Sequence, residues 1–178
     1  FFLILVWGGD DRRYASMKFF IYTFTASVLM LIGILVMYFH TDPISGLGSL
    51  TGHHFDLVSM TAQSSGNGLI AGEGLRHFVW LLLLIGFATK MPSVPVHTWL
   101  PDAHVQAPTA GSMLLAGVML KMGAYGFLRI AVTIFPESTV VFTPLLIMLG
   151  MASLVYGAIV CMGQTNLKRM VAYSSVSH

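Results

Sequence analysis

FFIYTFTASVLMLIGILVMYF, residues 19–39, is an apolar run that contains no formally charged side chain. A helix needs about 20 mostly apolar residues to cross the hydrocarbon core of a bilayer, so this run alone is long enough. The whole chain is 56% hydrophobic and 9% charged, whereas a soluble domain carries about 25% charged residues. The sequence therefore predicts an all-α fold, a polytopic bundle of transmembrane helices.

Other stretches have the length or the apolar content of membrane spans. The expected elements are a partial span at residues 1–6, spans at about 18–39, 76–100, 109–133 and 138–163, and the start of a span from residue 169. Because apolar patterns are cut at both ends, we expect residues 1–178 to be a single membrane domain, an internal fragment of a longer protein. Residues 40–74 are rich in Gly, Ser, Thr and His, and they predict an exposed loop with room for a short surface helix.

The span at residues 76–100 is predicted to be broken. The segment after Lys90 contains four prolines: Pro92, Pro95, Pro101 and Pro108. Proline removes a backbone donor and breaks a helix, and in lipid this is tolerated only where protein or water satisfies the freed groups. We expect one half of the helix to end near Lys90 and a second, short half to cover about residues 95–100.

The distribution of Lys and Arg over the connections predicts an orientation in the membrane. One side holds five basic residues, namely Arg12, Arg13, Lys18, Lys168 and Arg169, and the other side holds two, Arg76 and Arg129. Short loops on the cytoplasmic side of a membrane are enriched in Lys and Arg. We therefore expect the first and last loops in the cytoplasm, or its organellar equivalent, and residues 40–74 on the outer side.

Lys121 is the residue that most favours a chemical function, because it lies inside an apolar span. A charge at mid-membrane costs at least about 2.5–3.5 kcal/mol. The alternative is a lysine that snorkels to the interface. The next charged residue, Arg129, lies eight residues later, which corresponds to roughly 12 Å along a helix at about 1.5 Å per residue. A lysine side chain covers only part of the distance from Lys121 to that position. A proton-handling or water-lined role is favoured over snorkelling.

Lys90 is ambiguous from the residues alone. It ends an apolar run, which is an ordinary snorkelling position, but it also stands at the helix break, where the exposed carbonyls favour a cation. No acidic residue lies in any complete span. Either a carboxylate partner lies outside this sequence or the intramembrane lysines are partly neutral, since burial disfavours the charged form. A group that alternates between the two forms is suited to proton transfer.

Other functions are disfavoured. A net charge of +2 is too small to suggest nucleic acid, and Cys161 alone gives neither an internal disulfide nor a metal framework. His97, Asp102 and His104 resemble a metal set, but we expect them instead to satisfy backbone groups at the membrane edge. The sequence contains no phosphate-binding loop and no dinucleotide-binding glycine motif.

Several segments resemble the signature of the antiporter-like subunits of the proton-translocating NADH:quinone oxidoreductase, respiratory complex I. These segments are TKMPSVPVHTWLPDAH at 89–104, APTAGS at 107–112, LAG at 115–117, KMGAYG at 121–126, NLKRMVAYSSVSH at 166–178, WGG at 7–9 and KFF at 18–20. The WLPDA core is also shared with cation/proton antiporters. Among these subunits the resemblance is closest to subunit M, the equivalent of mitochondrial NADH dehydrogenase chain 4, and it is loose only at residues 40–74.

The resemblance implies a role for each matching residue. Lys90 corresponds to the lysine of the broken helix, Lys121 to the central lysine of a water-filled proton path, and His178 to the histidine that continues the path. It also implies a glutamate partner for Lys90 and a later ionisable residue, both outside this sequence. The implied function is proton translocation coupled to electron transfer from NADH to ubiquinone or another quinone.

The resemblance also implies where the chemistry and the partners are. NAD, FMN, iron–sulfur clusters and the quinone would bind other subunits, with no cofactor in this chain. The partners would be other membrane subunits of complex I, the lipid bilayer, protons and internal water, with no nucleic acid. The expected location is the bacterial cell (inner) membrane or the mitochondrial inner membrane. A sodium/proton antiporter subunit and a membrane subunit of an energy-converting hydrogenase remain alternatives.

Overall fold

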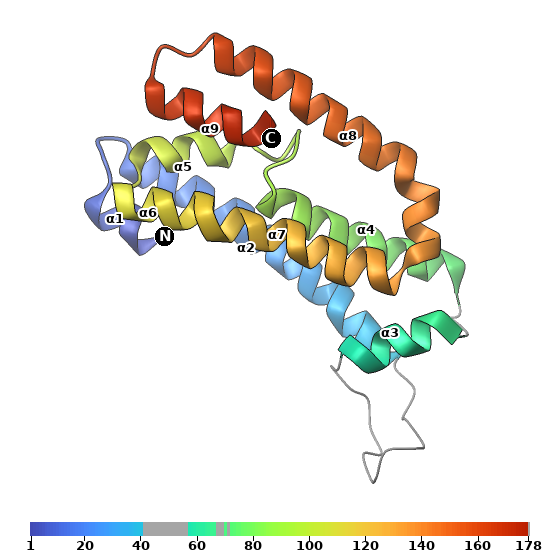
Figure 1. Cartoon of the computed structure of the whole chain (residues 1–178). Coiled ribbons are helices and arrows are strands. Elements are labelled where there is room, and N and C mark those ends of the chain that lie inside the picture. The colour runs from blue at the N-terminus through green and yellow to red at the C-terminus, as the bar shows by residue number, and fades with distance from the viewer. Residues whose placement is uncertain (41–56, 67–69, 71, 178) are drawn as a thin grey trace.

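The structure is a computed structural model that describes residues 1–40, 57–66, 70 and 72–177. Every regular element within these residues is a helix (Figure 1). In chain order they are α1 (Phe2–Trp7), α2 (Arg12–Phe39), α3 (Leu57–Gly66), α4 (Glu73–Lys90), α5 (Trp99–Gln106), α6 (Thr109–Leu114), the π-helical stretch η1 (Leu115–Met119), α7 (Leu120–Gly126), the π-helical stretch η2 (Phe127–Val132), α8 (Pro136–Met162) and α9 (Leu167–Ser177).

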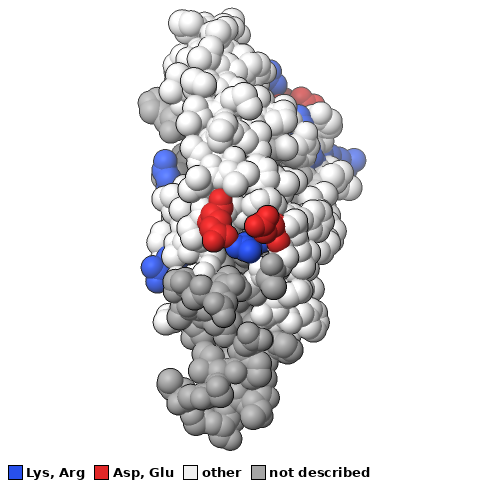
Figure 2. Space-filling model, turned by 90° about the vertical axis from the view of Figure 1, so that its right-hand side faces the viewer, with Lys and Arg blue, Asp and Glu red and all other residues white. Residues whose placement is uncertain are grey.

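Three helices among the described residues are long and apolar enough to cross a membrane: Arg12–Phe39, Thr109–Val132 and Pro136–Met162. The second of them is continuous from α6 to η2. Most of the atoms not drawn in grey in Figure 2 are white, so charged side chains are few on that face and gather in small groups. The prediction of an all-helical integral membrane protein is confirmed. The division into individual spans stays a prediction.

Close contact between α2 and α4 forms the centre of the bundle. The two helices lie side by side (Figure 1), and Gly86 allows the approach: a Cβ at this position would lie 2.7 Å from the Cβ of Met30 and 3.2 Å from the carbonyl oxygen of Ala26. Since real Cβ atoms do not approach so closely, glycine is required for this packing. The aromatic rings of Trp80, Phe87 and Phe127 continue the same core toward η2.

The broken helix is confirmed in its first half and corrected in its second. Helix α4 ends at Lys90, as expected, but the second half is α5 at Trp99–Gln106, and the prediction of residues 95–100 was wrong. Pro92 and Pro95 keep residues 91–98 in turns, because proline also disfavours the helical conformation of the residue before it. Pro101 instead lies in the first turn of α5, where a missing N–H is not needed for a helical hydrogen bond.

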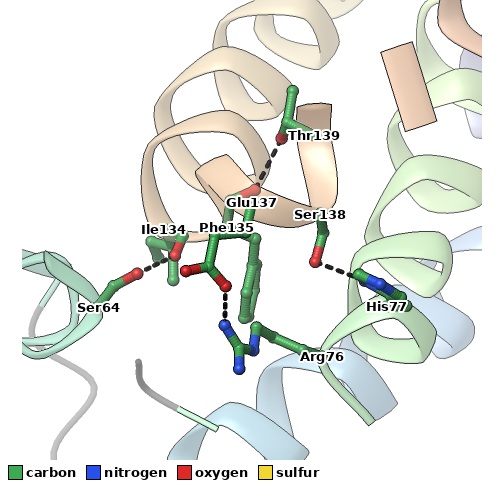
Figure 3. A network of polar contacts seen from close by, with 8 residues as sticks. All are labelled: Ser64, Arg76, His77, Ile134, Phe135, Glu137, Ser138 and Thr139. Atoms are coloured by element: carbon green, nitrogen blue, oxygen red, sulfur yellow. Dashed lines mark hydrogen bonds and ion pairs between the residues drawn. The ribbon is translucent and has the colours of Figure 1, made fainter. Parts of the chain in front are cut away.

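The two ends of the bundle carry separate polar clusters. At one end, Lys18 Nζ lies 2.7 Å from a carboxylate oxygen of Asp102, and Arg169 Nη2 lies 3.8 Å from the other oxygen. At the opposite end, Arg76 pairs with Glu137 (Figure 3). Lys18 and Arg169, which the sequence analysis assigned to one side, therefore lie at the end opposite to Arg76. Which end faces the cytoplasm stays a prediction.

Helix α3 lies within the predicted loop at residues 40–74. Its Ser64 hydroxyl donates to the carbonyl oxygen of Ile134, next to the turn into α8 (Figure 3). Helix α3 is thereby attached to the end of the bundle that carries the Arg76–Glu137 pair. The remainder of that predicted loop, at 41–56, 67–69 and 71, lies outside the described residues.

Candidate functional site: a cavity beside the helix break

A cavity of about 390 Å³ lies where the helix break, α7 and α9 meet. The break contributes Met91 and Pro92 to its wall. The residues that line it are Met91, Pro92, Ala116, Leu120, Lys121, Ala124, Val171, Ser174 and Ser175. A lysine and two serines in a wall that is otherwise apolar provide a few polar groups at which water can bind.

Lys121 lies in the first turn of α7 and lines the cavity with an exposed side chain. The π-helical stretch η1 ends at Met119, two residues before Lys121. Short π-helical stretches occur frequently at functional sites because they change which side chains share a helix face. The helix that carries Lys121 spans Thr109–Val132 and is one of the three that are long and apolar enough to cross a membrane. The chemical role of Lys121 stays a prediction.

Lys90, at the end of α4, is half-buried and packs against the helix that carries Lys121. A Cβ at Gly123 would lie 3.0 Å from the Cβ of Lys90 and 3.2 Å from the Cγ of Met91. Gly123 follows Lys121 by two residues in the sequence. The structure therefore brings the end of α4 and the Lys121 segment of α7 into direct contact, while Met91 also lines the cavity.

Helix α9 forms the third wall of the cavity. Gly157 of α8 lets it approach closely, since a Cβ at this position would lie 2.9 Å from the backbone nitrogen of Ser177. The Ser177 hydroxyl also donates to the carbonyl oxygen of Leu154, at 3.2 Å. His178, the third predicted site residue, follows directly but lies outside the described residues.

The residues that resembled a metal set are used in different ways. His97 is buried, and its ring lies 5.1 Å from the ring of Tyr156 and 6.3 Å from that of Tyr173. Asp102 is engaged with Lys18 and Arg169. Within residues 1–40, 57–66, 70 and 72–177, no three His, Cys, Asp or Glu side chains form a group that could hold a metal ion.

Sequence reasoning missed the ion pairs of Asp102 and the packing of Gly123. The sequence analysis assigned Lys18 and Arg169 to the same side, but it did not assign Asp102 to a side. The pairing itself could not be predicted, because it depends on how α2, α5 and α9 pack. Gly123 and Gly126 are spaced as neighbours on one helix face, which is a weak signal for a close helix contact.

The sequence pattern of the family described as "NADH:quinone oxidoreductase/Mrp antiporter, TM" matches residues 1–178, which is the whole chain. The chain belongs to this family. Curated relatives in the family include NADH-quinone oxidoreductase subunit M of Rhodobacter capsulatus, 46% identical over 180 residues, and NAD(P)H-quinone oxidoreductase chain 4 3 of a Picosynechococcus species, 44% identical over 178 residues. Both matches cover 100% of this chain but only 34% and 30% of the relatives, so the chain spans about a third of their length.

Solved structures of this family have the same arrangement of helices. Respiratory complex I from Thermus thermophilus with bound NADH contains a chain with a TM-score of 0.81 and 29% identity, and the match covers 99% of this chain and 35% of that one. The Mrp complex from Dietzia sp. DQ12-45-1b gives a TM-score of 0.69 at 22% identity, with 93% and 28% coverage, which supports the fold alone. The predicted antiporter-like fold and the predicted relationship to subunit M are confirmed.

Proposed function

We propose that this chain is part of a proton-translocating membrane subunit of an NADH:quinone oxidoreductase, in a bacterial cell membrane. The observation that carries the proposal is the cavity that Lys121 lines, beside the helix break that follows Lys90. Similarity to subunit M over the whole chain supports the assignment to an oxidoreductase complex. The redox chemistry would take place on other subunits, which would also bind NAD, FMN, the iron–sulfur clusters and the quinone.

Three residues of this chain would handle the proton. Water in the cavity would carry it between Lys90, Lys121 and His178. Each nitrogen accepts a proton in its neutral form and releases it again to water or to the next group, so no other bond is made or broken. The hydroxyls of Ser174 and Ser175 face the same cavity and provide hydrogen-bonding positions for that water.

Electrostatic repulsion would couple the sites. Two unit charges repel by about 4 kcal/mol at 4 Å for an effective dielectric constant of about 20, and by less at greater distance. Charging Lys90 therefore makes it more costly to charge Lys121. Contact between the end of α4 and Gly123 places the two lysine-bearing segments against each other.

A sodium/proton antiporter subunit is the second candidate. The description of the family includes Mrp antiporters, and the fold match to the Mrp complex supports keeping this candidate. The two functions differ in what drives the proton: electron transfer in the oxidoreductase, or the gradient of another cation in the antiporter.

The full-length protein, tagged and purified from its own membranes, distinguishes these functions. We expect flavin and iron–sulfur subunits to co-purify with it. We also expect NADH to drive proton uptake into inverted vesicles and a strain lacking the subunit to lose that uptake. If sodium dissipates an imposed proton gradient without NADH and no flavin co-purifies, the protein is an antiporter subunit and the proposal is wrong.

A further inference from the structure

The backbone hydrogen bonds at the end of α4 are displaced in an orderly way. In a continuous helix, each carbonyl accepts from the N–H four residues later, and the carbonyl of Phe87 still accepts from Met91 N at 2.8 Å. The regular helical donor for the carbonyl oxygen of Ala88 would be Pro92, which has no N–H. Ser93 N donates to the carbonyl oxygen of Ala88 instead, at 3.0 Å. The Thr89 carbonyl thereby loses its regular helical donor.

Trp99 supplies the missing donor. Its indole Nε1–H donates to the carbonyl oxygen of Thr89 at 3.0 Å, and the bond is buried. The Trp99 side chain is 2% exposed and lies against the ring of Phe19, 5.3 Å between centroids. A buried carbonyl without a donor is costly, so this bond stabilises the end of α4 across the break, from the first residue of α5.

The segment between the two half-helices is held from other directions as well. Val94 N–H, the regular helical donor for the Lys90 carbonyl, donates instead to Ser153 Oγ of α8, at 2.9 Å. The hydroxyls of Tyr22 and Thr98 are hydrogen-bonded at 3.0 Å, which attaches the segment to α2. Of these contacts, the Trp99 bond is the one made to the residue directly before Lys90.

We propose that Trp99 is a positioning residue for proton transfer: its indole N–H holds the Thr89 carbonyl and so fixes Lys90 against α7, beside the cavity that Lys121 lines. Lys90 is then fixed on two sides, by the hydrogen bond on Thr89 and by packing of its own backbone and Cβ on Gly123. Loss of the N–H would free the last turn of α4 and let the Lys90 side chain leave its position. This inference rests on the proposed function of Lys90.

Trp80 provides a matched control in the same helix as Lys90. It is also buried, at 0% exposure, and its Nε1–H also donates at 3.0 Å, to Thr139 Oγ1 of α8. It lies ten residues before Lys90, roughly 15 Å along the helix at about 1.5 Å per residue. Trp99→Phe and Trp80→Phe therefore remove the same kind of group from two buried indole rings, but only the first acts next to Lys90.

The test uses the full complex and two readouts. The first is the rate at which a water-soluble maleimide alkylates Lys90→Cys, combined with Cys161→Ser, followed by mass spectrometry of the subunit. We expect Trp99→Phe to raise this rate roughly threefold or more, the size that loss of one hydrogen bond allows, and Trp80→Phe to leave it unchanged. The second readout, with Lys90 intact, is NADH-driven proton uptake per assembled complex, which should fall with Trp99→Phe only.

Two further variants separate the outcomes. Benzothienylalanine at position 99 carries sulfur in place of the N–H and keeps the ring shape, so it answers the question if Trp99→Phe does not assemble. Lys90→Ala tests the proposed function by itself: normal pumping in that variant would refute the role of Lys90, while the alkylation rate still reports whether Trp99 positions the side chain. Equal alkylation rates in the Trp99 and Trp80 variants, or no change with benzothienylalanine, would overturn the inference.

Discussion

Gly123 lies directly against Lys90. A Cβ at position 123 would meet the Cβ of Lys90 at 3.0 Å and its carbonyl carbon at 3.3 Å, so the neighbouring atoms would have to move by a few tenths of an ångström. The contact joins the end of the broken helix to the helix that carries Lys121. Absence of a side chain at one position therefore determines how closely the two lysine-bearing segments approach each other.

Gly123→Ala should weaken proton translocation, whereas Gly117→Ala should not. Both changes gain helix propensity of up to about 1 kcal/mol. A Cβ at Gly117 meets no described atom within 4 Å, but a Cβ at Gly123 is crowded, and overpacking costs about 1–3 kcal/mol. The measurement is NADH-driven proton uptake per assembled complex, together with the temperature of half-inactivation. Equal proton uptake and equal half-inactivation temperatures in the two variants would show that proton translocation does not depend on the close contact between Gly123 and Lys90.

Asp102→Asn should destabilise the complex more than Arg169→Gln. The side chains of Lys18 and Asp102 are 20% and 23% exposed and 2.7 Å apart, whereas Arg169 is 50% exposed and 3.8 Å away. Loss of a partly buried, charge-assisted hydrogen bond costs about 1.5–3 kcal/mol, while an exposed ion pair contributes about 0–1 kcal/mol. Temperatures of half-inactivation rank the two variants. If Arg169→Gln is as damaging as Asp102→Asn, the Arg169 pair contributes more than its exposure predicts.

Labelling from each side of the membrane tests the orientation. In a Cys161→Ser background, Asp10→Cys should react with an impermeant maleimide only from the cytoplasmic side, and Gly74→Cys only from the outer side. Both positions are exposed, and a Cβ at Gly74 has no described atom within 4 Å. Basic residues number five at the Asp10 end and two at the Gly74 end, which is the basis of the expectation. The opposite labelling pattern would invert the topology.

The sequence alone predicted the helices and the break because both depend on local chemistry. Apolar runs long enough to cross a bilayer predict α2 and α8, and Pro92 terminates α4 at Lys90 as expected. The start of α5 was misplaced by several residues. Pro101 looked like a helix breaker, yet in the first turn of α5 it removes no helical hydrogen bond, so the helix begins at Trp99 and extends past it.

The site was predicted as individual residues and not as an arrangement. Lys121 was identified from the free-energy cost of placing a charge in an apolar span. Lys90 was identified as a site residue only through the family resemblance. The bond from Trp99 to Thr89 spans ten residues and depends on how the chain turns at 91–98, which no periodicity encodes. The π-helical stretch η1 likewise has no sequence signal in this chain, although it determines which face of the helix presents Lys121.

Proton uptake by inverted vesicles, driven by NADH and normalised to assembled complex, tests the role of Lys121 most directly. Lys121→Ala should assemble and lose most of the pumping, because it removes the nitrogen that binds and releases the proton. Lys121→Arg should fail as well, since a guanidinium stays protonated. Normal pumping by Lys121→Ala would contradict the account. Normal pumping by Lys121→Arg, with a Lys121→Ala protein that does not assemble, would contradict it too and make Lys121 a structural charge.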